Sequence, residues 1–138
     1  MPESITHMEY VKLCGIYIKE HMIPMGNGPF IFFDKPNSLV KPPSLIGGVH
    51  PDLYYKRSDL LIIGEAKSET DIDNPHSRKQ YEYYFKECEC FEGVSYMVFC
   101  TSWTSCVTLW NMVRRMKRES GYHAHIVVLC ESGVYKKD

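Results

Sequence analysis

Residues 47–67 read GGVHPDLYYKRSDLLIIGEAK and decide the fold prediction. Residues 52–55 favour a short strand, and residues 60–67 form a strongly apolar strand that ends in charge. The charged segment between them, residues 56–59, is short enough to be the turn of a hairpin. This stretch therefore predicts two neighbouring strands with charged residues gathered at one end of a sheet.

Further helix and strand patterns lie on both sides of this hairpin. Helices are predicted from apolar spacing at residues 6–22, 75–92 and 104–119, and strands at residues 29–33, 94–100 and 124–129. Asn74 is expected to cap the second helix, with Pro75 in its first position and Gly93 as its stop. The order is helix, three strands, helix, strand, helix, strand. We interpret residues 1–138 as one α/β domain with a central mixed sheet flanked by helices.

The composition excludes several classes of protein. The 138 residues are 44% hydrophobic and 24% charged, which argues against disorder, collagen-like repeats and a coiled coil. A membrane span needs roughly 20 consecutive apolar residues, and the apolar runs of this chain are far shorter. The first residues show no basic segment followed by an apolar one, so no secretory signal is evident. We expect a cytoplasmic protein without membrane association.

The six cysteines are expected to be reduced thiols, because no CxxC pair occurs and no secretory context supports disulfides. His123, His125 and Cys130 are the residues that a zinc site would use. Tetrahedral zinc sites need two well-spaced pairs of ligands, which these residues do not provide. We do not predict a zinc centre.

Three charged side chains are predicted to converge at one end of the hairpin. Asp52 starts the first strand, and Glu65 and Lys67 end the second strand on the same face, because alternate residues of a strand share a face. Two converging carboxylates repel unless positive charge lies between them. A hard divalent cation is the usual solution, and the Ala66 carbonyl oxygen could be a further ligand. Lys67 beside it would orient a water and stabilise charge on a phosphate.

These residues also carry a resemblance to a known family. Pro-Asp at residues 51–52, followed by Glu-Ala-Lys at residues 65–67, resembles the PD-(D/E)XK signature of the restriction-endonuclease-like phosphodiesterases. A Gly-x-x-Pro-Asp turn is present at residues 48–52, and Gln80 lies early in the following helix. Over about residues 6–100, the chain is similar to small VRR-NUC-type and Holliday-junction-resolvase-like members. The resemblance implies a restriction-endonuclease-like domain of order αβββαβ, here with an added C-terminal αβ.

The resemblance implies roles for single residues. Asp52 and Glu65 would ligate Mg²⁺, which Mn²⁺ would be able to replace, and Lys67 would position the attacking water. The implied activity is hydrolysis of DNA phosphodiester bonds, with endonucleolytic cleavage favoured and RNA left open. His50, before the Pro-Asp pair, departs from the family pattern, in which a small or apolar residue is commoner.

Residues of the neighbouring helices complete the site that the resemblance implies. Glu9 would add a metal ligand from the first helix, and Glu20 is the alternative acid on that helix. Gln80 would line the site and contact water or phosphate. Tyr84, one turn later, either joins Gln80 at the site or belongs to the core.

The charge of the chain requires a local basic face if it binds nucleic acid. The net charge is −1, from 16 Lys+Arg and 17 Asp+Glu, so no general positive field exists. Basic clusters in the second and third helices could contact phosphates, and a solvated helix face is the alternative interpretation. The candidate nucleic-acid-binding residues are Arg78, Lys79, Arg114, Arg115, Lys117 and Arg118.

We therefore hypothesise a metal-dependent nuclease, possessing no room for a separate target-recognition domain. Selectivity would then come from nucleic-acid structure, from a homodimer or from a recruiting partner protein. The alternatives are a catalytically silent nucleic-acid-binding module that keeps the fold, and a structural α/β protein with a chance motif.

Overall fold

The computed structural model describes residues 5–23, 32–33 and 45–138. Three longer helices, two short 3₁₀ helices (η1 and η2) and six strands make up this part of the chain. In chain order they are α1 (Ile5–His21), β1 (Phe32–Phe33), η1 (Ile46–Gly48), β2 (Leu53–Arg57), β3 (Leu60–Ala66), η2 (Glu69–Asp71), α2 (Pro75–Cys90), β4 (Val94–Cys100), α3 (Cys106–Ser120), β5 (His125–Cys130) and β6 (Gly133–Lys137). Of the predicted strand at residues 29–33, residues 29–31 lie outside the described ranges.

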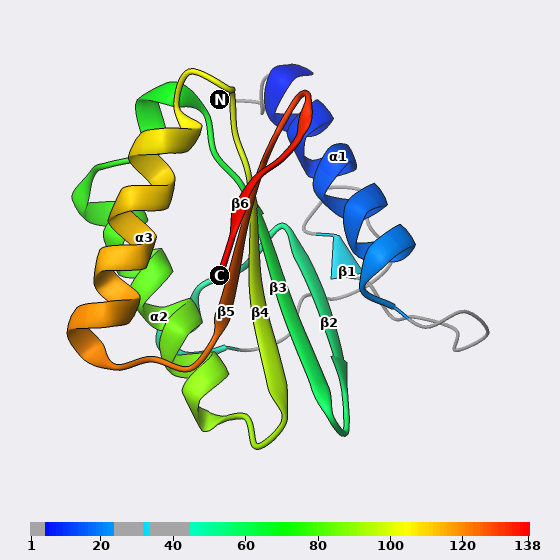
Figure 1. The fold of residues 1–138 in the computed structure, drawn as a ribbon. Coiled ribbons are helices and arrows are strands. Elements are labelled where there is room, and N and C mark those ends of the chain that lie inside the picture. Colours follow the sequence, from blue (N-terminus) through cyan, green and yellow to red (C-terminus); the bar gives the residue numbers. More distant parts are fainter. Residues whose placement is uncertain (1–4, 24–31, 34–44) are drawn as a thin grey trace.

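The described strands form one mixed sheet in the order β1-β2-β3-β4-β5-β6. β3 pairs in parallel with β4, and β4 with β5, whereas the other neighbouring pairs are antiparallel. Parallel neighbours need a crossover connection, and α2 and α3 supply the two crossovers. In Figure 1, α1 covers one face of the sheet and α2 and α3 cover the other. The expected α/β class, with a mixed sheet flanked by helices, is confirmed.

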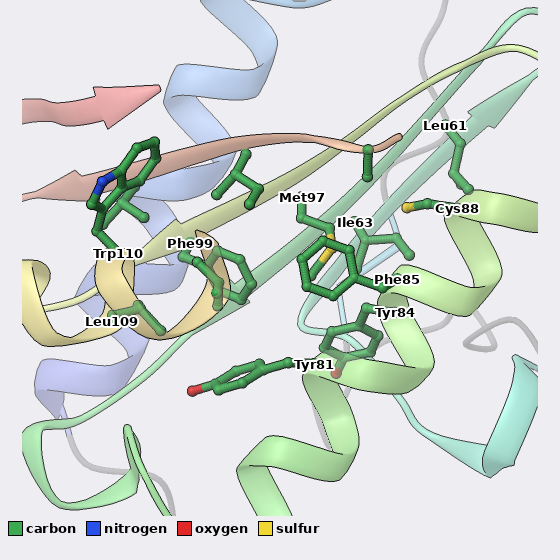
Figure 2. Packing of buried hydrophobic residues seen from close by; sticks show 14 of the residues in the cluster. Leu61, Ile63, Tyr81, Tyr84, Phe85, Cys88, Met97, Phe99, Leu109 and Trp110 are labelled. Carbon is green, nitrogen blue, oxygen red and sulfur yellow. The ribbon is translucent and has the colours of Figure 1, made fainter. Parts of the chain in front are cut away.

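Both faces of the sheet are buried, so its central strands have two apolar sides. All seven residues of β3 are buried. Leu60 and Ile62 pack with α1, whereas Leu61 and Ile63 pack with α2 and α3. Figure 2 shows the core between the sheet and helices α2 and α3, in which the aromatic side chains of α2 lie against β4. A strand buried on both faces is expected to be apolar along its length, so charged residues at its end are unusual.

The predicted helix ends agree with the structure in part. The Asn74 side chain accepts a hydrogen bond of 2.8 Å from the Ser77 N–H, so the predicted cap of α2 is confirmed. The helix ends before Gly93, however, with Phe91 as its C-cap. Gly93 is needed for another reason: a Cβ there would lie 2.5 Å from the Asp59 carbonyl oxygen in the β2–β3 turn.

β6 was not predicted from the sequence. Its five residues are exposed or half-buried, so they lack the apolar alternation that marks a strand. It pairs with β5 at the edge of the sheet and carries two lysines, as edge strands commonly do. Across the described residues, no helix has the length and apolar character required to cross a membrane.

Candidate active site

The register of the β2–β3 hairpin places Asp52 opposite Glu65. Leu53 pairs with Gly64, so the next residues toward this end of the two strands are Asp52 and Glu65. The Asp52 N–H donates to Glu65 Oε1 at 3.2 Å, and the Ala66 N–H donates to Asp52 Oδ2 at 2.9 Å. Both carboxylates are buried, with residue exposures of 7% and 5%. Each strand thus holds the carboxylate of the other in place.

The electrostatics of this pair favour an additional positive charge. The pKa of Glu65 is raised well above its usual value, first by burial and then by the nearby charge of Asp52. The Lys67 charge and hydrogen bonds from Tyr84 and from the Asp52 backbone act in the opposite direction but do not cancel the effect. A proton on Glu65, or a cation bound beside it, would therefore stabilise this pair.

Lys67 is buried beside the carboxylates and is held by α2. Its Nζ lies 3.8 Å from Glu65 Oε2 and donates to Ser77 Oγ at 3.2 Å. It also donates a short hydrogen bond to Gln80 Oε1. Gln80 thus belongs to the site, and it orients the ammonium group. Ser77 was missed from the sequence, although it lies one turn before Gln80 on the same side of the helix.

Tyr84 satisfies both of the interpretations that the sequence left open. Its ring is fully buried in the core between α2 and the sheet (Figure 2). Its hydroxyl donates to Glu65 Oε1 at 3.1 Å. One residue therefore packs the core and fixes the orientation of a site carboxylate.

On α1, the residue that approaches the carboxylates is His7. Its Nε2 lies 3.4 Å from Asp52 Oδ2, and the His7 side chain is 18% exposed. Glu9 is exposed, because a step of two residues turns a helix by about 200° and places it on the opposite side. Glu20 is 66% exposed near the other end of α1, next to His21. The structure thus brings neither predicted helix acid to the carboxylates.

A signal for His7 was present in the sequence. Val11 and Cys14 belong to the apolar, inward stripe of this helix, and His7 lies four and seven residues before them. Extending the stripe by one turn would have found it.

The donor set fits a hard divalent cation. Mg²⁺ is usually held by one or two carboxylates and keeps several of its waters. Asp52 and Glu65, with the Ala66 carbonyl at the same strand end, offer such oxygens. Within residues 5–23, 32–33 and 45–138, no group of three or more His, Cys, Asp or Glu side chains is arranged to hold a metal. A closed, all-protein cage is therefore not formed by these residues.

No protein-family model, curated protein or solved structure matches this chain.

The predicted basic residues lie at different distances from the strand ends that carry Asp52 and Glu65. Arg78 and Lys79 lie in the first turns of α2, which begins at the edge that bears Lys67, and Arg78 pairs with Asp73 at 2.6 Å. α3 runs away from that edge (Figure 1), so its basic residues lie toward the other end. Arg114 and Lys117 both pair with Asp138, at 3.6 and 3.7 Å, whereas Arg115 and Arg118 are exposed. The described structure does not bring the α3 cluster to the carboxylates.

Proposed function

We propose that this protein is a metal-dependent nuclease with a restriction-endonuclease-like domain. It would hydrolyse DNA phosphodiester bonds, preferably within a strand, using Mg²⁺ or Mn²⁺. The observation that carries the proposal is the pair of buried carboxylates from adjacent strands with a buried lysine at 3.8 Å. Burying such a group of charges costs stability, and a structural role explains that cost poorly.

The residues of the site divide the chemistry among them. Asp52 and Glu65 would hold the cation, which when bound supplies Lewis-acid stabilisation of phosphate charge and a more acidic water. Lys67 would donate a hydrogen bond to the attacking water or to a phosphate oxygen, where negative charge develops. Ser77 and Gln80 keep its ammonium group oriented toward the carboxylates.

Lys67 also changes the charge that an approaching phosphate would meet. Its ammonium group compensates part of the carboxylate charge, and it lies on the α2 side of the sheet with Glu65. A phosphate that approaches the site therefore meets one fixed cation rather than two bare carboxylates. Selectivity for nucleic-acid structure would come from surfaces around this edge, from a homodimer or from a partner protein.

The test is cleavage by the purified protein. Supercoiled plasmid, branched DNA, single-stranded DNA and RNA are incubated with Mg²⁺, with Mn²⁺ or with chelator. We expect cleavage only with metal, and we expect Lys67→Ala to lose at least ~100-fold in rate, which is typical of a removed catalytic group. Lys86→Ala is the matched control, because Lys86 is an exposed lysine of α2 that pairs with Glu82.

The outcomes separate the nuclease from the alternatives. Binding of nucleic acid without cleavage in either metal would identify a catalytically silent module. Cleavage that survives Lys67→Ala would show that the site lies elsewhere. The absence of both binding and cleavage would leave a structural α/β protein with a chance motif.

A further inference from the structure

Trp103 is an exposed tryptophan in the loop after β4, at the end of the strands where the candidate site lies. Its residue exposure is 68%, the largest among the big apolar side chains of the described residues. The other tryptophan, Trp110, is buried in the core at 5% exposure (Figure 2). Leaving a tryptophan in water forgoes a large burial energy, since its side chain is among the largest apolar surfaces available.

The loop that carries Trp103 is fixed by hydrogen bonds along its length. Residues 101–105 connect β4 to α3. Ser102 Oγ and Thr104 Oγ1 both donate to Glu69 Oε1, at 3.1 and 2.8 Å. The Trp103 N–H donates to Glu131 Oε2 at 3.1 Å, and its carbonyl oxygen accepts from Cys106 Sγ at 3.0 Å. The backbone is therefore held in place while the indole projects into solvent.

The same loop is joined to the end of β3 and, through Glu131, to α1. Thr101 Oγ1 donates to the Lys67 carbonyl oxygen at 2.7 Å. Glu131, which accepts from Trp103, also accepts from the Tyr10 hydroxyl at 2.8 Å, and Tyr10 lies one turn after His7 on α1. In Figure 1 this loop lies at the same end of the sheet as the start of α1. The backbone that carries the indole is thus tied to Lys67 through Thr101 and to α1 through Glu131 and Tyr10.

We propose that Trp103 is a stacking platform for an unpaired nucleobase next to the phosphate that is cleaved. The inference rests on the proposed nuclease function and names its substrate class: single strands or strand ends with unpaired bases, rather than continuous duplex. Stacking on an aromatic ring needs a free base face, and the bases of a duplex cover one another's faces. Every base has such a face, so this contact tolerates any sequence.

The charges around the loop indicate that stacking, and not phosphate attraction, would supply the contact. Residues 101–105 contain no Lys or Arg, and the carboxylates that hold the loop are Glu69 and Glu131. The pKa of Glu69 is lowered by its hydrogen bonds from Thr104 and Ser102, so this carboxylate stays charged. A phosphate would gain nothing here, whereas a base would cover the apolar indole.

The test is a binding titration in chelator, where no turnover occurs. A labelled single-stranded oligonucleotide and a blunt duplex of the same sequence are titrated with the wild type, Trp103→Ala, Trp103→Phe and Val94→Ala. Val94 is the matched control, since it is a 49% exposed apolar residue at the opposite end of β4. We expect Trp103→Ala to weaken single-strand binding roughly five- to 150-fold.

The remaining variants and conditions sharpen this expectation. Trp103→Phe should retain most of the affinity, and Val94→Ala should bind as the wild type does. Duplex binding should be equal in all four proteins. The dependence of affinity on salt should keep its slope in Trp103→Ala, because no phosphate contact is lost. Single strands, but not the duplex, should quench the emission of the exposed indole in the wild type.

Failure of the inference is distinguishable from failure of the nuclease proposal. If Trp103→Ala binds single strands like the wild type, stacking is overturned, while metal-dependent cleavage by the same variant would still support the nuclease. A wild type that neither binds nor cuts nucleic acid overturns both. If Trp103→Ala instead changes the oligomeric state in size-exclusion chromatography and leaves oligonucleotide binding unchanged, Trp103 belongs to a protein interface and the inference is overturned.

Discussion

Glu65 is a buried acid whose environment opposes its ionisation, and this makes the stability of the protein depend on pH. Its folded-state pKa is raised, chiefly by burial and then by Asp52. An unfolded chain releases the proton of a Glu near its ordinary pKa of about 4.3. The folded protein thus binds this proton more tightly than the unfolded protein does. Its contribution to stability is present below that pKa and is lost as the pH rises through the raised one.

The first prediction follows from that sign. In chelator, Glu65→Gln should remove part of the loss of stability that the wild type shows as the pH rises above about 4.3. Urea denaturation at several pH values measures this difference. Glu119→Gln, an exposed residue of α3, serves as the control. Parallel stability curves for the wild type and Glu65→Gln would show that the carboxyl is not destabilised by its surroundings.

The orientation of α1 decides which of its side chains can reach the carboxylates of Asp52 and Glu65. His7 faces Asp52 at 3.4 Å, and Glu9 is exposed. We predict that His7→Ala weakens the response to Mn²⁺ and slows cleavage by about 10–100-fold, the usual cost of losing a ligand or its partner. Glu9→Gln, the conservative change on the same helix, should have a smaller effect.

The activity assay across a Mn²⁺ series compares these two variants. A larger defect in Glu9→Gln than in His7→Ala would restore the sequence-based prediction that Glu9 provides the helix ligand.

The basic face of α3 is separated from the carboxylates, so we expect it to affect nucleic-acid binding and not the chemistry of cleavage. We predict that replacing Arg114, Arg115 and Arg118 together by Gln weakens nucleic-acid binding. Each lost phosphate contact should reduce the slope of log affinity against log salt by about one. Arg114 already pairs with Asp138 at 3.6 Å, so fewer than three contacts are expected to be lost.

A salt series with a labelled oligonucleotide measures this effect, and cleavage of saturating substrate should change little. An unaltered salt dependence would show that these arginines form only a solvated helix face.

The sequence predicted the parts of the site that depend on local periodicity. Glu65 and Lys67 share a face because strands alternate, and the short hairpin turn sets Asp52 opposite Glu65. The parts that depend on tertiary contacts were out of reach. Ser77 acts only through Lys67, from a helix whose rotation about its axis is fixed by the core. The family resemblance implies an acid on the first helix, whereas the inward face of α1 places His7 beside Asp52.

Elements without burial left no signal in the sequence. β6 forms because it pairs with the edge of a sheet already built by β3, β4 and β5, and its residues are exposed or half-buried. Similarly, the position of the Trp103 loop depends on contacts with Glu69 and Glu131, residues far away in the chain. Patterns of apolar spacing carry no information about such contacts.

For the chain as a whole, we propose that Asp52 and Glu65 form a metal site at the cost of stability. Asp52→Asn keeps the shape and can still accept the hydrogen bond from the Ala66 N–H. It removes a charge that raises the pKa of Glu65. In chelator, this variant should therefore have a free energy of unfolding about 0.5–2 kcal/mol larger than that of the wild type, and it should melt at a higher temperature.

The deciding measurement is a set of thermal melts of the wild type and Asp52→Asn, each in chelator and in millimolar Mn²⁺. At a hundredfold excess over its Kd, a ligand stabilises the folded state by about 2.7 kcal/mol. We predict that Mn²⁺ raises the Tm of the wild type and raises that of Asp52→Asn much less, so that the difference between their Tm values narrows or reverses. A wild type with the same Tm in chelator and in Mn²⁺, and an Asp52→Asn variant no more stable than it, would contradict a metal site at Asp52 and Glu65.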